Sequence, residues 1–328
     1  MLRYDIHRIV LVDSEARPAS LAGPLPPVFI SGRGDGSADL NIYTGDFTYH
    51  GQGGFYYEGP IKLGILRSKF LLRGLEGRTE LRVLSPRYRL FGEFRREVKK
   101  LIFEILELKL LQKGHTMLHA ACVEKGGEGV VLVGLPNTGK TFTTIKLVRD
   151  HGFNFMSDDM AILGPRGIIY CFPTPMTIHP VHLRGLKLSL PWAIRFSVKN
   201  RWRLKSIRWL GRFVSEFKMD YRYVLGDVHL TEKTRATLIF FLEQGPRGLA
   251  SLDTRSALSK LVPVAKMHRS LLDELLVKYA YYHPELNLYE LSREQDELYR
   301  ELVESADCFV VRAPDRSFAD IIVGESIV

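Results

Sequence analysis

The sequence predicts a mixed fold of the α/β (α+β) class, in which a small β-rich domain precedes a larger mixed-sheet domain. Short apolar runs separated by Gly, Pro and Asp clusters fill residues 1–90, which is the pattern of strands and turns. From residue 91 to residue 328, helical periodicity alternates with short buried-strand patterns. A chain of 328 residues is long enough for two such domains, expected at 1–90 and 91–328.

The β-rich domain is predicted from a series of strand-like runs. They lie at 8–12, 28–30, 40–43, 54–57 and 79–84. A helix is expected next over 91–113, because Phe94, Val98 and Leu101 recur at helical spacing and Gly114 is a helix-ending residue. This helix leads the chain into the motifs of the larger domain.

The larger domain is predicted from alternating strand and helix patterns. Its strands are expected at 129–133, 161–163, 168–170, 237–242, 309–311 and 321–323. A turn at 164–167 joins the second and third of these strands as a hairpin. Its helices are expected at 142–149, along an apolar stripe from Met267 to Tyr279, and after a capping box formed by Ser292 and Gln295.

Composition and cysteine usage predict an intracellular protein without disulfides or a zinc site. The chain is 45% hydrophobic and 25% charged, which is ordinary for a folded protein. Its 3 cysteines, Cys122, Cys171 and Cys308, show no CxxC spacing. Charged residues interrupt the N-terminus before an apolar run can form, so no signal peptide is expected, and no segment is expected to span a membrane. We therefore expect a cytoplasmic protein.

A glycine-rich motif, G-x-x-x-x-G-K-T, directly follows the expected strand at 129–133. Such a loop lays successive backbone N–H groups around phosphates, and glycine supplies the freedom that this requires. Lys140 is expected to reach the β and γ phosphates and the Thr141 hydroxyl to ligate Mg²⁺, at a helix N-terminus that favours an anion. The candidate nucleotide-binding residues are Gly134, Asn137, Thr138, Gly139, Lys140 and Thr141.

Two adjacent carboxylates, Asp158 and Asp159, end the apolar run that begins at Phe155. Like charges this close repel each other, so solvent or a cation must neutralise them. Mg²⁺ held with the nucleotide phosphates is the natural partner, and the alternative is a solvated strand end in which Asp158 caps a turn. The sequence therefore makes Asp158 and Asp159 candidate catalytic residues, with Thr141 and Asp159 as candidate metal ligands.

In their order along the chain, these segments resemble the core of the HPr kinase/phosphorylase family. The resemblance rests on Leu118-His119, the hairpin 123–129, the glycine-rich motif, Gly152 and Ser157-Asp158-Asp159. That family belongs with the phosphoenolpyruvate carboxykinase-like nucleotide-binding folds. The resemblance implies a P-loop core like the C-terminal domain of HPr kinase, and an ATP-dependent kinase that uses Mg²⁺ to bridge the phosphates.

The resemblance also implies residue roles. By position, Lys140 and Thr141 match the phosphate and metal residues, and Asp158 and Asp159 match the acidic pair that activates the hydroxyl acceptor. His119 matches the active-site histidine, as a proton relay or a phosphate contact. Without the resemblance, its position between apolar neighbours is typical of a core residue. Members of the family often assemble, which leaves a homo-oligomer open.

The chain departs from the family pattern in three places. Phe142 stands where the family has a Glu after its P-loop Ser, and 136–137 is Pro-Asn where the family usually has a small residue. The segment 182–186 has His in place of the Glu of a Glu-Leu-Arg-Gly-Leu segment. These departures favour a related kinase with another acceptor. Arg184 in the last segment is a candidate for stabilising charge in the transition state, and the alternative is a surface connection.

A basic segment at 195–222 carries most of the net charge of +9. It contains nine Lys or Arg residues against Glu216 and Asp220. Basic residues at helical spacing form one stripe, which comprises Arg201, Lys205, Arg208 and Arg212. Such a basic amphipathic helix docks an acidic protein, nucleic acid or an anionic membrane surface, and the alternative is a helical insertion with a solvated basic face.

The sequence thus supports a leading function and two alternatives. The leading function is an ATP-dependent kinase whose acceptor is a hydroxyl of a protein or peptide Ser, a small molecule or an RNA, with Asp158 or Asp159 accepting the proton. In the second, ATP occupancy orders the basic segment for an anionic partner and turnover is incidental. The third is a carboxykinase-like enzyme for a small acid, which calls for a further Lys and His metal set that the sequence does not show.

Overall fold

The structure is a computed structural model, and the chain folds as a mixed α/β protein with mixed sheets, which confirms the predicted class. It describes residues 1–15, 25–32, 36–49, 51, 54–60, 67–83, 92–180, 182, 192–206, 217–267 and 272–324. Arg184 and the part of the basic segment at 207–216 lie outside the described residues.

Contacts divide the chain into two compact units, each formed by two segments. The first unit joins Met1–Gly114 with Arg269–Glu294, and the second joins His115–His268 with Gln295–Val328. The predicted domains divide the chain at residue 90 instead, so the helix that follows this point belongs to the first unit. The return of 269–294 to the first unit depends on long-range contacts, which local sequence patterns do not reveal.

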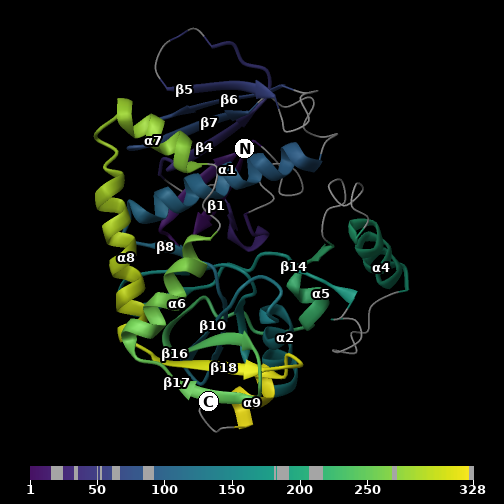
Figure 1. Cartoon of the computed structure of the whole chain (residues 1–328). Coiled ribbons are helices and arrows are strands. Elements are labelled where there is room, and N and C mark those ends of the chain that lie inside the picture. Colours follow the sequence, from purple (N-terminus) through teal and green to yellow (C-terminus); the bar gives the residue numbers. More distant parts are fainter. Residues whose placement is uncertain are drawn as a thin grey trace. The chain divides into compact units, whose positions relative to one another are not determined.

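Within the described residues, the first unit contains a seven-stranded sheet in the order β3-β1-β2-β4-β7-β6-β5 (Figure 1). Its strands are β1 (Leu2–Ile6), β2 (Val10–Ser14), β3 (Ile30–Ser31), β4 (Leu40–Thr44), β5 (Phe55–Pro60), β6 (Arg67–Arg73) and β7 (Thr79–Val83). Strands β2 and β7 alternate buried and half-buried residues, as expected where one face of a sheet meets a core. Helices α1 (Gly92–Leu111) and α7 (Leu272–Tyr282) belong to this unit, and α1 contacts β2.

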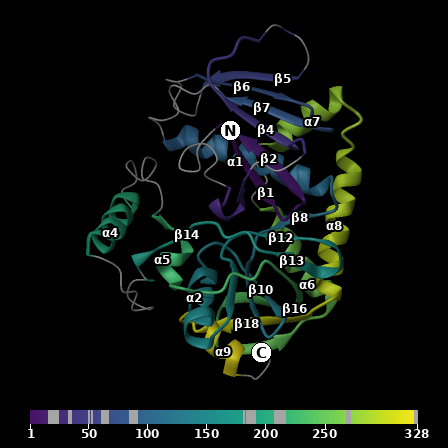
Figure 2. The same cartoon turned by 180° about the vertical axis from the view of Figure 1, so that it is seen from behind.

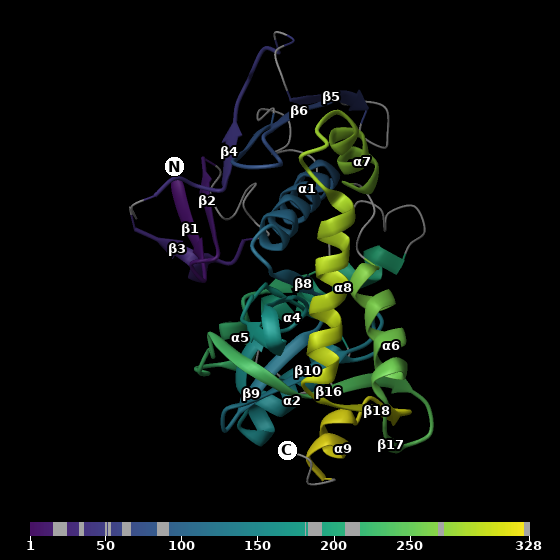
Figure 3. The same cartoon turned by 90° about the vertical axis from the view of Figure 1, so that its left-hand side faces the viewer.

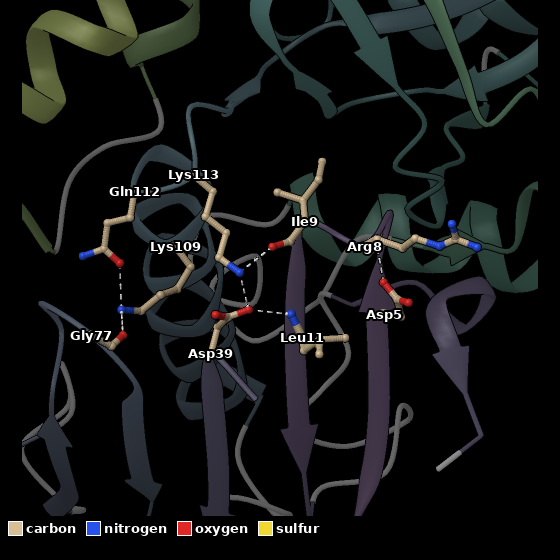
Figure 4. A network of polar contacts seen from close by, with 9 residues as sticks. All are labelled: Asp5, Arg8, Ile9, Leu11, Asp39, Gly77, Lys109, Gln112 and Lys113. Atoms are coloured by element: carbon tan, nitrogen blue, oxygen red, sulfur yellow. Dashed lines mark hydrogen bonds and ion pairs between the residues drawn. The ribbon is translucent and has the colours of Figure 1, made fainter. Parts of the chain in front are cut away.

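A buried lysine, Lys109, fixes the end of α1 to the loop before β7 (Figure 4). Its Nζ donates to the carbonyl oxygens of Leu75 at 2.8 Å and Gly77 at 2.5 Å, and to Oε1 of Gln112 at 2.9 Å. Burial lowers the pKa of Lys109 to about 8, and the Asp39 and Glu76 carboxylates act in the opposite direction. The amine therefore serves as a structural crosslink within this unit.

Lys113, just beyond α1, makes a second set of polar contacts (Figure 4). Its Nζ donates to the Ile9 carbonyl oxygen at 2.6 Å and forms an ion pair with Asp39 Oδ2 at 2.7 Å. The same Asp39 oxygen accepts the backbone N–H of Leu11 at 2.8 Å. These contacts join the helix end to the residues that directly precede two neighbouring strands, β2 and β4.

Within the described residues, the second unit contains a nine-stranded sheet. Its strands are β8 (Thr116–Leu118), β9 (Ala121–Lys125), β10 (Glu128–Val133), β11 (Asn154–Ser157), β12 (Ala161–Leu163), β13 (Ile168–Tyr170), β16 (Lys233–Gln244), β17 (Gly248–Ser251) and β18 (Asp307–Ala313). The order is β11-β9-β10-β16-β13-β12-β8, and β18 pairs with the later part of β16 and with β17 (Figure 2). A separate pair is formed by β14 (Met176–Thr177) and β15 (Lys218–Met219).

Strands β10, β11, β16 and β18 share one direction, which decides where the loops that follow them lie. β10 is parallel to β16, and β16 is parallel to β18. β11 is antiparallel to β9, which is antiparallel to β10, so β11 also runs parallel to β10. The residues that follow β10, β11 and β18 therefore emerge at the same edge of the sheet, where open α/β sheets bind ligands.

Both faces of this sheet are covered by helices. They are α2 (Lys140–His151), α5 (Tyr221–Leu225), α6 (Thr254–Lys266), α8 (Leu288–Glu304) and α9 (Phe318–Gly324). The unit also contains α4 (Trp192–Ser206), whose Val198 joins the core on the α2 side. Alternate residues of β10 enter different cores: Val130 packs with α2 and α9, and Val131 packs with α6 and α8, which lie side by side in Figure 3. Of the helices in the described residues, none is long and apolar enough to cross a membrane.

The predicted strand at 321–323 is wrong, because these residues belong to helix α9. The buried residues of α9 recur at helical spacing and face one core, and they are Phe318, Ala319, Ile321 and Ile322. Periodicity alone does not distinguish a buried strand from a helix when the apolar run is this short. The other strands predicted for the larger domain are confirmed, as are the helices predicted at 91–113 and 142–149.

Helix α8 begins earlier than the predicted capping box. It starts at Leu288, and Asn287 Oδ1 accepts a backbone N–H of the first turn at 3.2 Å, so Asn287 takes the role expected of Ser292. Gln295 is buried instead, and its Nε2 donates to Thr116 Oγ1 at 2.6 Å. The sequence pattern was correct about the helix and wrong about its first residue.

Candidate functional site

The glycine-rich loop at 134–139 connects β10 to α2 at the carboxyl edge of the sheet (Figure 1). Asn137 has a φ of 65° and Gly139 a φ of 127°, so the chain turns through left-handed conformations that glycine and asparagine favour. A Cβ added at Gly134 would lie 3.3 Å from the Leu242 carbonyl oxygen, closer than an ordinary contact. The loop is therefore shaped by its glycines as the motif predicts.

Lys140 is the first residue of α2, and its side chain folds back over the loop. Nζ is buried and donates to the Gly134 carbonyl oxygen at 2.5 Å. Burial lowers the pKa of Lys140, while the Asp159 and Asp158 carboxylates act in the opposite direction. A buried ammonium whose hydrogen-bond acceptor is a neutral carbonyl provides a strong binding group for an anion that enters the loop.

The first turn of α2 meets the acidic pair through Thr141. Its Oγ1 donates to Asp158 Oδ2 at 3.1 Å. Asp158 directly follows β11, and this strand ends at the same edge as β10. The contact joins two motifs that are separated in the sequence, and it brings a hydroxyl and a carboxylate together beside the glycine-rich loop.

The second oxygen of Asp158 has no hydrogen-bond partner in the part of the chain that the structure describes. Asp158 is only 4% exposed, and among the described residues its Oδ1 contacts no donor. Burial, followed by the neighbouring Asp159 charge, raises the pKa of Asp158 to about 7, while the Thr141 hydrogen bond and Lys140 act in the opposite direction. A buried carboxylate with an unsatisfied oxygen is costly on its own and is stabilised by a bound cation.

Asp159 lies in a different environment from its neighbour. Its side chain is 55% exposed, and its Oδ1 lies 3.6 Å from Nδ1 of the buried His119. The same nitrogen lies 3.4 Å from the Met160 sulfur. His119 comes from the connection between β8 and β9, which reaches the same edge. The pair thus presents one buried carboxylate and one that faces solvent beside an imidazole.

The structure brings most of the predicted site residues together. These residues belong to the second unit and come from its sheet edge, and they are the glycine-rich loop, Lys140, Thr141, both aspartates and His119. Contacts connect Lys140 to the loop, Thr141 to Asp158 and His119 to Asp159. Arg184 was also predicted to take part, and it lies outside the described residues.

His182, which begins the segment with Arg184, is buried near the start of α2. Its ring centroid lies 6.3 Å from that of Phe142 and 5.3 Å from that of His179. Burial, followed by His179 and Arg316, lowers the pKa of His182 to about 4, and its Nδ1 accepts the His179 backbone N–H at 3.3 Å. The imidazole is therefore neutral at physiological pH and acts as a packing and hydrogen-bonding group.

The basic segment does not form one helix as predicted. Helix α4 ends at Ser206, and the segment later contributes to β15 and to the short helix α5. Asp220 caps α5 by accepting the Arg222 backbone N–H at 3.0 Å, and it also pairs with the Arg222 side chain. Arg201 and Lys205 of the predicted basic stripe lie on α4, and Arg208 and Arg212 lie outside the described residues. On α4, Phe196 and Trp202 are 50% and 42% exposed.

Sequence reasoning missed two cations at this edge. Arg316 follows β18, and its Nη2 donates to the Asn137 carbonyl oxygen at 3.2 Å. Lys218 of β15 lies close enough to Asp158 to lower its pKa. Neither residue belongs to a recognisable motif. Arg316 is the one of the two that a sequence pattern could indicate, because it follows a strand that is parallel to the strand before the glycine-rich loop.

Comparison with known proteins gives no family for this chain. No family model matches the sequence, and no curated protein sequence matches it.

Proposed function

We propose that this chain is an ATP-dependent kinase that transfers the γ-phosphate to a hydroxyl acceptor. The observation that carries the proposal is the Thr141–Asp158 hydrogen bond, because it connects the first turn after the glycine-rich loop to a buried acidic residue. In P-loop enzymes, a hydroxyl after the loop lysine and an aspartate at a strand end together hold the nucleotide's metal. We include in this proposal an HPr kinase-like P-loop core and a cytoplasmic location, where ATP is abundant.

The residues at this edge fit Mg²⁺. Thr141 and Asp158 are hard oxygen donors, and Asp158 Oδ1, which has no partner among the residues that the structure describes, needs a cation or a donor. We therefore assign the metal to Thr141 and Asp158, and not to Asp159 as the sequence suggested, because Asp158 is the carboxylate beside Thr141. Mg²⁺ bound there neutralises phosphate charge, and Lys140 contributes a second positive charge from the loop.

Asp159 is left to accept the proton of the acceptor hydroxyl. It is the exposed member of the pair, so an incoming substrate can reach it, and His119 lies 3.6 Å away. His119 orients the Asp159 carboxylate and can share its proton when protonated. The acceptor classes that suit this arrangement are a Ser of a protein or peptide, or a hydroxyl of a small molecule, since an exposed base excludes neither.

The test follows the γ-phosphate. The purified chain is incubated with γ-labelled ATP, Mg²⁺ and an extract of its source organism, beside Lys140→Ala. Lys146→Ala is the matched control, since Lys146 lies on the same helix and pairs with Asp320 at 3.0 Å, away from the loop. We expect labelled product with wild type and Lys146→Ala and none with Lys140→Ala. Label released only as inorganic phosphate would contradict a kinase.

The second candidate function is a nucleotide-gated binding protein. The observation in its favour is the pair of exposed aromatic residues, Phe196 and Trp202, on the basic helix α4. An exposed aromatic side chain beside basic residues suits an anionic protein, nucleic acid or membrane surface. This function predicts that ATP strengthens binding to such a partner while no phosphorylated product forms.

A further inference from the structure

Arg316 lies in the turn between β18 and α9, on the opposite side of the glycine-rich loop from the acidic pair. In the sheet, β11 lies on one side of β10, beyond β9, and β18 lies on the other side, beyond β16. All of these positions are at one edge, because β10, β11, β16 and β18 run in the same direction. The loop is thus flanked by carboxylates on one side and by Arg316 on the other.

The Arg316 side chain lies directly against the loop. Its Nη2 donates to the Asn137 carbonyl oxygen at 3.2 Å. A Cβ added at Gly139 would lie 3.3 to 3.4 Å from the Cβ, Cγ and Cδ of Arg316, so the absence of a side chain at Gly139 makes room for the arginine stem. The guanidinium is therefore positioned by the loop that is proposed to hold the phosphates.

The backbone at Arg316 is held in an unfavourable conformation. Its φ is 66°, in the left-handed region that few residues other than glycine adopt. Asp315 Oδ1 accepts the Ser317 backbone N–H at 3.2 Å, and Phe318 is buried at the start of α9, so both sides of the residue are fixed. Strain of this kind persists where the surrounding structure enforces it, and it is concentrated at functional sites.

The charge of Arg316 is not neutralised by the described part of the chain. Across the described residues, no carboxylate lies within 4.0 Å of the guanidinium, and Asp315 is engaged with Ser317. A guanidinium has five N–H donors and a flat face, and the contact with Asn137 uses one donor. Among the described residues, no hydrogen bond to the remaining donors is present, so they and the flat face can contact a ligand that lies along the sheet edge.

The direction of the nucleotide follows from these positions. The transferred phosphate must lie near Thr141, Asp158 and Asp159, because the metal and the proton acceptor act on it. The nucleoside then extends from the loop away from the acidic pair, which is toward β18. We infer that Arg316 binds the nucleoside end of the nucleotide, with its guanidinium against the base and ribose. Stacking on a base and donation to ribose oxygens both suit its planar group.

This inference rests on the proposed function for the presence of a nucleotide, and a binding experiment separates the two. Calorimetric titration of the full chain compares ATP with inorganic tripolyphosphate, which carries the phosphates without a nucleoside, both with Mg²⁺. The variants are Arg316→Ala and Arg316→Gly. The alanine variant keeps the Cβ that is strained at this φ, and the glycine variant removes it, so together they test the side chain with and without the backbone strain. Arg312→Ala is the control, since Arg312 lies on β18 and pairs with Glu243 at 3.0 Å.

We expect both Arg316 variants to bind ATP about tenfold more weakly, as loss of one base-stacking contact predicts, and to bind tripolyphosphate within about twofold of wild type. Equal losses for both ligands would make Arg316 a phosphate contact and overturn the inference, and so would unchanged ATP affinity. Wild type that binds neither ligand would instead overturn the proposed function, and the inference would fall with it.

Discussion

Two buried charges, Lys109 in the first unit and Asp158 in the second, are stabilised to different extents. Lys109 donates to three oxygens, and each of its N–H groups can therefore be satisfied within the protein. Asp158 has a donor for only one of its oxygens among the described residues. The first arrangement is complete as a structural feature, whereas the second leaves an oxygen that a cation or a donor would satisfy, which is why we propose the metal at Asp158.

Asp158→Asn is expected to stabilise the metal-free protein and to abolish the Mg²⁺ dependence of nucleotide binding. The raised pKa, from 3.8 to about 7, corresponds to a cost of up to roughly 4 kcal/mol for the ionised carboxylate, and the neutral amide removes this cost. Urea unfolding in a chelating buffer at neutral pH or above measures the first effect. Asp159→Asn is the control, because that side chain is 55% exposed and its neutralisation should change stability little. Equal unfolding free energies for Asp158→Asn and wild type would contradict the assignment.

Lys109 predicts a pH dependence of stability. Its pKa falls from 10.5 to about 8 on folding, so between these values the unfolded state binds more protons and stability rises with pH. Below pH 8 the amine is charged in the folded state, and its burial lowers the free energy of unfolding by the full amount, roughly 3 kcal/mol. Wild type should therefore gain about 2 kcal/mol relative to Lys109→Met between pH 7.5 and 9.5, measured by urea unfolding of both proteins. A constant difference between the two proteins over this range would contradict the expectation.

At the scale of elements, the strand–loop–helix from β10 to α2 was predictable from local sequence, and its surroundings were not. The apolar run 129–133 and the glycine spacing sufficed for this element, because each feature is local. The positions of Asp158 and Arg316 around it depend on which strands pair with β10, and pairing is a long-range property. A different limit explains α9, because the periodicity of a short buried run does not distinguish a strand from a helix.

Gly139→Ala tests the fit between the loop and the turn after β18. Alanine is strained at a φ of 127°, and its Cβ would lie 3.3 Å from the Arg316 side chain, so nucleotide affinity should fall at least tenfold. Gly152→Ala is a matched control at the other end of α2, where φ is 72° and nothing lies within 4 Å of the added Cβ. Both variants should lose about 1 kcal/mol of stability, and only Gly139→Ala should lose affinity for ATP, measured by calorimetric titration. Similar ATP affinities for the two variants would contradict a binding role for this loop.

At the scale of the whole molecule, the proposed site belongs entirely to the second unit, although that unit is formed by two separate segments. The glycine-rich loop and the acidic pair come from His115–His268, and Arg316 comes from Gln295–Val328. A nucleotide that contacts residues from both segments therefore stabilises the unit as a whole. The gain in unfolding free energy depends on the nucleotide concentration relative to Kd and is about 2.7 kcal/mol at one hundred times Kd.

Hydrogen exchange can locate this stabilisation. With saturating ATP and Mg²⁺, we expect increased protection in the loop 134–139, in the first turn of α2 and in the turn between β18 and α9, because these segments contact the ligand or are fixed by it. The strands of the first unit should exchange at unchanged rates, since no proposed ligand contact lies there. Lys140→Ala should show none of these changes at the same ATP concentration. Protection that appears in the seven-stranded sheet of the first unit, and not around the loop, would place the nucleotide elsewhere and overturn the site derived from Lys140, Thr141 and Asp158.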